Sequence, residues 1–88
     1  MAWRIEVAET AKRSLAKLDR TTAKRIVVFL SRRLATSSDP RALGKPLRGP
    51  LREYWRYRIG DYRVICDIQD TLMRILVIDL GHRKDVYS

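Results

Sequence analysis

The sequence is poor in the residues with which proteins form disulfides, hold zinc or cross membranes. Its one cysteine, Cys66, cannot form an internal disulfide, and its one histidine, His82, leaves no conventional zinc site. No apolar stretch approaches the roughly 20 residues that a bilayer-spanning helix needs. These absences exclude a disulfide scaffold, a conventional zinc enzyme and a helical membrane protein.

Signatures of other enzyme and targeting classes are missing as well. The sequence has neither a Walker loop nor a dinucleotide fingerprint, and no set of nucleophile, histidine and carboxylate is suggested. Arg4 and Glu6 interrupt the early apolar run, so we expect no signal peptide. We therefore expect a protein of a reduced cytoplasm that uses no cofactor and no membrane.

Acidic residues are few beside basic ones. Ten Asp and Glu stand against 19 Lys and Arg in 88 residues, which gives a net charge of +9. Such an excess predicts a polyanionic partner, most often nucleic acid, although a solubilising surface or an acidic protein partner is also compatible with it. With 45% hydrophobic and 33% charged residues, the chain is predicted to form one globular domain, residues 1–88.

Two amphipathic helices are predicted after a short strand. Residues 3–7 alternate apolar and polar side chains, and from residue 8 the apolar period becomes helical. Asp19 or Thr21 can cap the second helix. The two apolar stripes are Ala8, Ala11, Leu15 and Leu18, then Ala23, Ile26, Val27, Leu30 and Leu34. Val28 and Phe29 widen the second stripe, which predicts a helix that is buried on more than one side.

The stretch 54–67 predicts a hairpin with Gly60 and Asp61 as a two-residue turn. This register pairs Arg58 with Arg63. One face then carries Trp55, Tyr57, Ile59, Tyr62, Val64 and Cys66, which is a core face, and the other carries Arg56, Arg58 and Arg63. Like charges opposite each other destabilise a sheet, so we predict an anion, a phosphate, between these guanidinium groups.

The remaining residues complete an α+β fold. Asp70 and Thr71 indicate a second tight turn before a strand over residues 72–80, which would place Arg74 opposite Asp67. The predicted order is β-α-α-β-β-β, a twisted, mostly antiparallel sheet with the two N-terminal helices packed on one face.

Four pieces in this order resemble the RelE family of bacterial toxins, within the RelE/ParE superfamily. They are the helical pair, the segment Lys-Pro-Leu-Arg-Gly at 45–49, the hairpin, and the segment Gly-His-Arg-Lys-Asp-Val-Tyr at 81–87. The resemblance covers essentially the full length. It implies a RelE-like fold and the toxin of a type II toxin–antitoxin pair, a metal-independent endoribonuclease that cuts mRNA in the ribosomal A site and so inhibits translation.

The resemblance also implies which residues form the site. Arg56 and Arg58 match the family's basic strand positions, and Arg63 matches the arginine of its Gly-Tyr-Arg-like turn. Arg83 and Tyr87 match the terminal arginine and tyrosine. The best-studied members carry lysine at the position of Arg56 and at a neighbouring one. Because arginine effectively cannot lose its proton, the general base stays unassigned.

Cleavage of RNA through its own 2′-hydroxyl requires a proton acceptor, stabilisation of charge on the phosphate, and a proton donor. The arginines suit the second task. Neighbouring cations favour the phenolate of Tyr87, which can handle a proton. His82 carries the one type of side chain that ordinarily changes charge near neutral pH, and it is a further candidate for catalysis or for stacking, or else a surface residue. Candidate contacts to RNA and the ribosome are Lys12, Arg13, Lys17, Arg32, Arg33, Lys45 and Arg48.

The expected partners are the ribosome with its mRNA and a cognate antitoxin, whose acidic, partly disordered segment would wrap the domain. Two alternatives stay open. One is a ParE-like toxin without nuclease activity that poisons DNA gyrase, and the other is a basic RNA-binding module without toxicity. The arginine cluster favours the nuclease, because a gyrase binder needs no cradle for phosphate.

Overall fold

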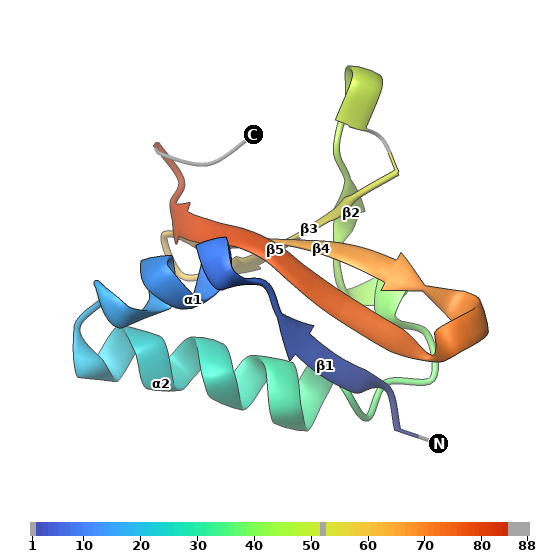
Figure 1. Ribbon diagram of the computed structural model, residues 1–88, viewed down its shortest axis with the longest axis horizontal. Coiled ribbons are helices and arrows are strands. Elements are labelled where there is room, and N and C mark those ends of the chain that lie inside the picture. The colour runs from blue at the N-terminus through green and yellow to red at the C-terminus, as the bar shows by residue number, and fades with distance from the viewer. Residues whose placement is uncertain (1, 52, 85–88) are drawn as a thin grey trace.

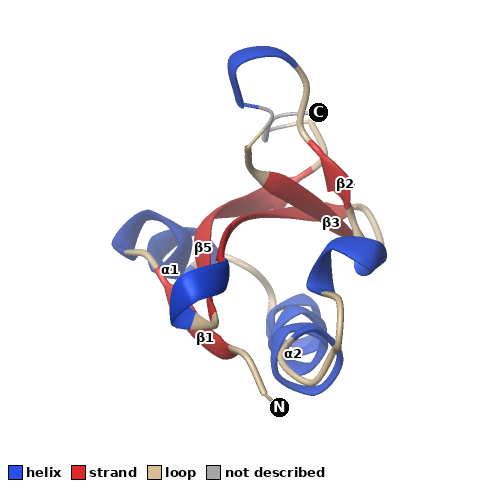
Figure 2. Cartoon of the chain, turned by 90° about the vertical axis from the view of Figure 1, so that its right-hand side faces the viewer, coloured by secondary structure: helices blue, strands red, loops and turns tan. Residues whose placement is uncertain are grey.

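The structure is a computed structural model that describes residues 2–51 and 53–84. These residues contain a five-stranded sheet and two α-helices. The strands are β1 (Arg4–Val7), β2 (Lys45–Pro46), β3 (Trp55–Ile59), β4 (Tyr62–Gln69) and β5 (Arg74–His82). The helices are α1 (Glu9–Ala16) and α2 (Arg20–Val28). Both helices lie on the same side of the sheet, while the turn Gly49–Leu51 projects on the other side (Figures 1 and 2). The α+β class and the placement of the helices are thus confirmed.

The strand order β1-β5-β4-β3-β2 contains one strand that the sequence did not predict. β2 has two residues and pairs antiparallel with β3, Lys45 opposite Arg56 and Pro46 opposite Trp55. Proline cannot donate to a ladder and is tolerated at a sheet edge, so a strand of this kind gives no periodic signal. β1 pairs in parallel with β5, Ile5 opposite Ile75, and the other pairings are antiparallel.

The second helix differs from the prediction in which of its side chains are buried. Asp19 caps α2 by accepting a hydrogen bond of 3.1 Å from the backbone N–H of Thr22. Ile26 is buried as expected, but Val27 is 47% exposed and Val28 39% exposed. The wide stripe was therefore misread, because side chains that step around a helix by about 100° cannot all face one sheet.

A π-helical segment, Phe29–Leu34, continues α2 and changes its register. The backbone N–H of Ala35 donates to the carbonyl of Leu30 at 3.0 Å, five residues earlier. Leu30 and Leu34, both within this segment, are buried in the core.

The core lies between the helices and the inner face of the sheet. It contains the buried side chains of Ile26, Leu34, Tyr57, Val64, Cys66, Ile75 and Val77. The hydroxyl of Tyr57 donates to the carbonyl of Pro40 at 2.8 Å, which fastens the segment after the helices to β3. Burial raises the pKa of the Cys66 thiol, so it stays protonated, in keeping with the structural role that its place on the predicted core face indicates.

The connection between β4 and β5 is longer than the predicted two-residue turn. A short 3₁₀ turn, Asp70–Leu72, is followed by Met73 in the left-handed region at φ 50°. Gln69 therefore lies opposite Arg74, and Asp67 lies opposite Leu76. The predicted pair of Arg74 with Asp67 is wrong: Arg74 instead forms an ion pair of 3.1 Å with Glu6 on β1.

Candidate active site

The hairpin β3–β4 has the register that its sequence predicts. Arg58 lies opposite Arg63, and Ile59 lies opposite Tyr62. Gly60 has φ +61°, whereas Asp61 does not adopt a positive φ. A two-residue turn with a positive φ at its first central residue is of type II′, which favours glycine there and matches the twist of the strands. The turn thus fixes two arginines side by side on the sheet face that the helices leave open.

Arg63 is the most unusual of these residues. It is only 9% exposed, and within the described part of the chain its Nε and Nη1 have no hydrogen-bond partner. Buried charged donors are ordinarily paired, because an unpaired one loses its hydration without compensation. On the neighbouring strand β5, Gly81 lies opposite Arg63 and brings no side chain to that position. The donors of Arg63 are therefore available to a bound acceptor.

Arg58, Arg63 and Arg83 converge on one small hollow. Its volume is about 40 Å³, and Gly60 and Asp61 complete its wall. The backbone N–H of Arg83 donates to the carbonyl of Asp61 at 2.9 Å, which ties the segment after β5 to the hairpin turn. We call this hollow, with its three arginines, the arginine pocket. It brings together Arg58, Arg63 and Arg83, three of the residues that the sequence and the family resemblance assign to the catalytic site.

The electrostatics of the arginine pocket favour an anion. Burial lowers the pKa of Arg63, and the positive charges of Arg56, Arg58 and Arg83 lower it further. Arginine nevertheless keeps its proton in proteins, so the repulsion is relieved by binding a counter-charge. Guanidinium groups match phosphate geometry with parallel hydrogen bonds, and such donors stabilise charge that develops in a transition state. The arrangement is suited to holding one phosphate.

A second hollow of about 330 Å³ extends this basic surface along β2 and β3. Lys45, Arg56 and Arg58 line it, together with the segment 42–44. Arg58 is shared with the arginine pocket, and Lys45 lies opposite Arg56 in the sheet. Lys45, predicted to contact RNA, thus lies beside the predicted catalytic arginines. The two hollows together can accommodate a phosphate and a neighbouring part of a polyanion.

The structure does not bring His82 to this surface. His82 lies opposite Tyr62, one position beyond the pair of Arg63 and Gly81, and strand residues alternate between faces. Its ring meets that of Tyr62 edge-on at 5.6 Å, and its Nδ1 accepts from the backbone N–H of Lys84 at 3.3 Å. His82 also lines a hollow with Ser14 and Lys17, on the helix side. Tyr87 lies outside the described residues.

The other predicted RNA-binding residues are spread over the surface. On α1, Lys12 is paired with Glu9 at 3.6 Å, and Arg13 is exposed, as is Lys17 just beyond its end. Arg32 and Arg33 are exposed on the π-helical segment, where the guanidinium of Arg33 lies 5.9 Å from the centre of the Phe29 ring. Arg48 is exposed beyond β2. None of these residues lines the arginine pocket.

Sequence reasoning missed two features of this region. The sequence marks Asp61 only as a turn residue, yet Asp61 lines the pocket, and its backbone carbonyl accepts from the N–H of Arg83. Gly81 places no side chain opposite Arg63, and only the β4–β5 register reveals this pairing.

A metal centre and a membrane-spanning helix are both absent from residues 2–51 and 53–84. No group of three His, Cys, Asp or Glu side chains there could hold a metal ion. No helix in these ranges is long and apolar enough to cross a bilayer.

Known proteins resemble the chain over nearly its whole length. The family described as "ParE toxin of type II toxin-antitoxin system, parDE" matches residues 5–87. Toxin RelG of Mycobacterium tuberculosis is 32% identical over 87 residues, 99% of this chain and 98% of the relative. Toxin RelE of the same organism is 34% identical over 85 residues, 97% and 86% of the two chains. The solved toxin–antitoxin complex RelBE2 from M. tuberculosis contains a chain with a TM-score of 0.86 and 29% identity, covering 97% of this chain and 95% of that one.

Proposed function

Because the chain belongs to the RelE/ParE superfamily of type II toxins, we propose that it is a ribosome-dependent mRNA endonuclease whose active site is the arginine pocket. The single observation that carries this proposal is Arg63, which is buried between Arg58 and Arg83 with two donors that have no partner among residues 2–51 and 53–84. Folding alone gives no reason for such an arrangement, whereas a phosphate would satisfy both the charge and the hydrogen-bonding groups. Its site of action would be the cytoplasm, where ribosomes translate mRNA.

The reaction we propose is transesterification within the RNA strand. The 2′-oxygen loses its proton and attacks the adjacent phosphorus, the bond between phosphorus and the 5′-oxygen breaks, and the leaving 5′-oxygen takes up a proton. The products are a 2′,3′-cyclic phosphate and a 5′-hydroxyl. Arg58, Arg63 and Arg83 would stabilise the negative charge on the non-bridging oxygens. Asp61 lines the same pocket, and we assign to its carboxylate the role of accepting the proton of the attacking 2′-hydroxyl.

The proposed partner is an antitoxin with an acidic segment. The chain carries a net charge of +9, and the related M. tuberculosis chain was solved as a toxin–antitoxin complex. A disordered acidic segment that folds on binding can cover a large basic surface.

A ParE-like poison of DNA gyrase is the second candidate, because the matching family is described as ParE toxin. Such a toxin would act by binding alone and would not need the unpaired donors of Arg63 in a phosphate-sized pocket. The identities of 32% and 34% to relatives named RelG and RelE favour the nuclease.

One induction experiment separates these functions. The chain is expressed in a bacterial host, new mRNA 5′ ends are mapped, and gyrase supercoiling is assayed with the purified protein. We expect cuts within translated reading frames, efficient cleavage on purified ribosomes and poor cleavage of naked RNA. Inhibited gyrase with intact mRNA would identify the ParE-like function, while bound RNA without either effect would identify a binding module.

A further inference from the structure

His82 precedes Arg83 in the chain but lies on the other side of the sheet from the arginine pocket. It lines a hollow of about 290 Å³ on the helix side, together with Ser14 and Lys17. Its ring is held there by the ring of Tyr62, which it meets edge-on with the centroids 5.6 Å apart. His82 lines no part of the arginine pocket, so a role in the reaction must act through its neighbour Arg83.

The ring of His82 closes the turn that follows β5. Its Nδ1 accepts a hydrogen bond of 3.3 Å from the backbone N–H of Lys84, two residues later. Asn and Asp side chains stabilise turns by the same contact, with the N–H two residues on. Because Nδ1 is the acceptor, the uncharged ring carries its proton on Nε2. The contact requires the uncharged ring, since both nitrogens of a protonated histidine are donors.

Two hydrogen bonds therefore hold the backbone of Arg83. Its own N–H donates to the carbonyl of Asp61 at 2.9 Å, and the N–H of the next residue donates to His82. One bond fastens this segment to the hairpin turn, and the other fastens it to a ring that packs on Tyr62. A fixed backbone reduces the conformational entropy that the guanidinium loses when it binds a phosphate.

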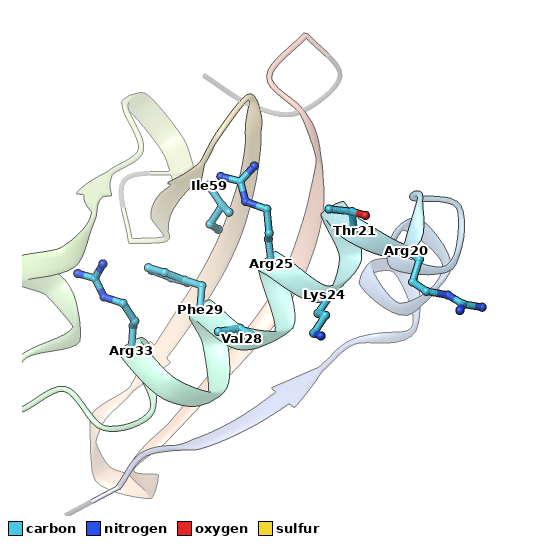
Figure 3. Close-up of a pocket in the computed structure, with 8 residues that line it drawn as sticks. All are labelled: Arg20, Thr21, Lys24, Arg25, Val28, Phe29, Arg33 and Ile59. Carbon is cyan, nitrogen blue, oxygen red and sulfur yellow. The ribbon is translucent and has the colours of Figure 1, made fainter.

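The hairpin turn that receives Arg83 is itself supported from the helix side. Figure 3 shows the groove between α2 and the end of β3, where Arg25 points toward Ile59. Nη1 of Arg25 lies 3.3 Å from the position that a Cβ on Gly60 would occupy. The guanidinium of Arg25 thus lies against the turn, and the carbonyl that accepts from Arg83 belongs to a supported segment.

We propose that His82 is a positioning residue whose uncharged ring holds Arg83 in the arginine pocket, an inference that rests on the proposed nuclease function. Protonation places a hydrogen on Nδ1 and breaks the contact with the N–H of Lys84. Histidine side chains ordinarily change charge near neutral pH. Cleavage should therefore slow as the pH falls through this range, although the ring touches neither the phosphate nor the 2′-hydroxyl.

Charged groups face the imidazole ring from several elements. Lys17, just beyond α1, repels a positive charge on the ring, and Asp79 on β5 attracts one, because both line the same hollow. The phenol of Tyr62 faces the ring from β4, and Arg83 and Lys84 add positive charge in the turn. Because these charges act in opposite directions, the pH at which the ring is protonated has to be measured.

Two substitutions separate the hydrogen bond of His82 from its ring. His82→Asn keeps an acceptor for the N–H of Lys84, whereas His82→Phe keeps an aromatic ring against Tyr62 but accepts nothing. Single-turnover cleavage of mRNA on ribosomes is measured from about pH 6 to about pH 8. At the upper end we expect His82→Asn to cleave like the unaltered chain. His82→Phe should be slower by about 10-fold or more, because small misplacements of a catalytic group are costly.

The pH profile distinguishes positioning from other roles. Towards about pH 6 the unaltered chain should slow relative to His82→Asn by about threefold or more, since Asn stays an acceptor. A ratio of these two rates that does not change with pH would overturn the proposal. Equal slowing of His82→Asn and His82→Phe would show instead that the imidazole takes part in the chemistry. Lost thermal stability in His82→Phe, with its cleavage rate per folded molecule retained, would show a merely structural residue.

Inorganic phosphate separates failure of this inference from failure of the proposed function. At about pH 8, where histidine is ordinarily uncharged, phosphate should raise the melting temperatures of the unaltered chain and of His82→Asn more than that of His82→Phe. If this pattern is found and the unaltered chain cleaves no mRNA, the nuclease function is wrong and the role of His82 stands. If the chain cleaves mRNA but phosphate stabilises all three proteins equally, His82 does not position Arg83.

Discussion

Arg63 offers the most discriminating test of the arginine pocket. The variant Arg63→Met removes the guanidinium and keeps most of the buried stem, so it separates charge from packing. The change removes two donors that have no partner in the described part of the chain, together with the repulsion from Arg56, Arg58 and Arg83. We therefore expect the melting temperature of the free protein to stay the same or rise.

Unlike the melting temperature, the rate of mRNA cleavage by Arg63→Met should fall strongly. If Arg63 stabilises charge on the scissile phosphate, losing one such preorganised donor lowers the rate of single-turnover cleavage by about 10²–10³. Inorganic phosphate provides a second measurement. At about ten times its dissociation constant it should raise the melting temperature of the unaltered chain by roughly 5–10 °C and leave that of Arg63→Met nearly unchanged.

Arg74 serves as the control, because it lies on the same sheet but is paired with Glu6 at 3.1 Å. Arg74→Ala should lose roughly 0.2–1 kcal/mol of stability and keep its cleavage rate per folded molecule. A structural Arg63 would behave in the same way. Lost stability with cleavage retained in Arg63→Met would therefore refute the assignment.

Three further changes test other parts of the molecule. Asp61→Asn removes the carboxylate of the arginine pocket but keeps the size of the side chain; we expect a lower kcat with KM unchanged, and an unchanged kcat would exclude Asp61 as proton acceptor. Gly44→Ala places a Cβ 2.5 Å from the carbonyl oxygen of Arg56, so thermal melting should show a clear loss of stability. At Gly49 a Cβ would meet nothing within 4 Å, so the control Gly49→Ala measures the cost of a positive φ alone. Arg41 and Asp70 form an ion pair of 2.7 Å, which lowers the pKa of Asp70 from its ordinary value of 3.8. The stability that this pair gives the folded protein is therefore present above pH 3.8 and is lost as the pH falls through the lowered pKa. Asp70→Asn should flatten this part of the stability profile, and an unchanged acid limb in urea melts at successive pH values would show that the pair contributes nothing.

The hairpin could be predicted to the residue because two independent signals agree on it. Alternation over residues 54–67 assigns the faces, and Gly60-Asp61 fixes the loop length, so the pair of Arg58 with Arg63 follows from sequence alone. The site residues on that hairpin were accordingly placed correctly on one face.

The sequence could not predict the features that only the tertiary structure determines, such as which apolar side chains of a helix are buried. Val27 and Val28 are as apolar as Ile26, and only the position of the sheet determines which of them is buried. Met73 adopts a left-handed conformation without being glycine, so nothing in the sequence marks the longer turn. The face of His82 depends on that turn and on an irregularity in pairing between Ile65 and Cys66. Neither can be read from periodicity.

The parallel pairing of β1 with β5 has a consequence for the order in which this molecule can assemble. β1 takes its sheet partner from residues 74–77, which follow it by 70 residues in the chain. Contacts so distant in sequence form late and slowly in folding. Arg83 reaches the pocket through the same end of the chain. A nascent chain therefore lacks the parallel pairing of its sheet until β5 has been synthesised, and it lacks the third arginine of its pocket until Arg83 has followed.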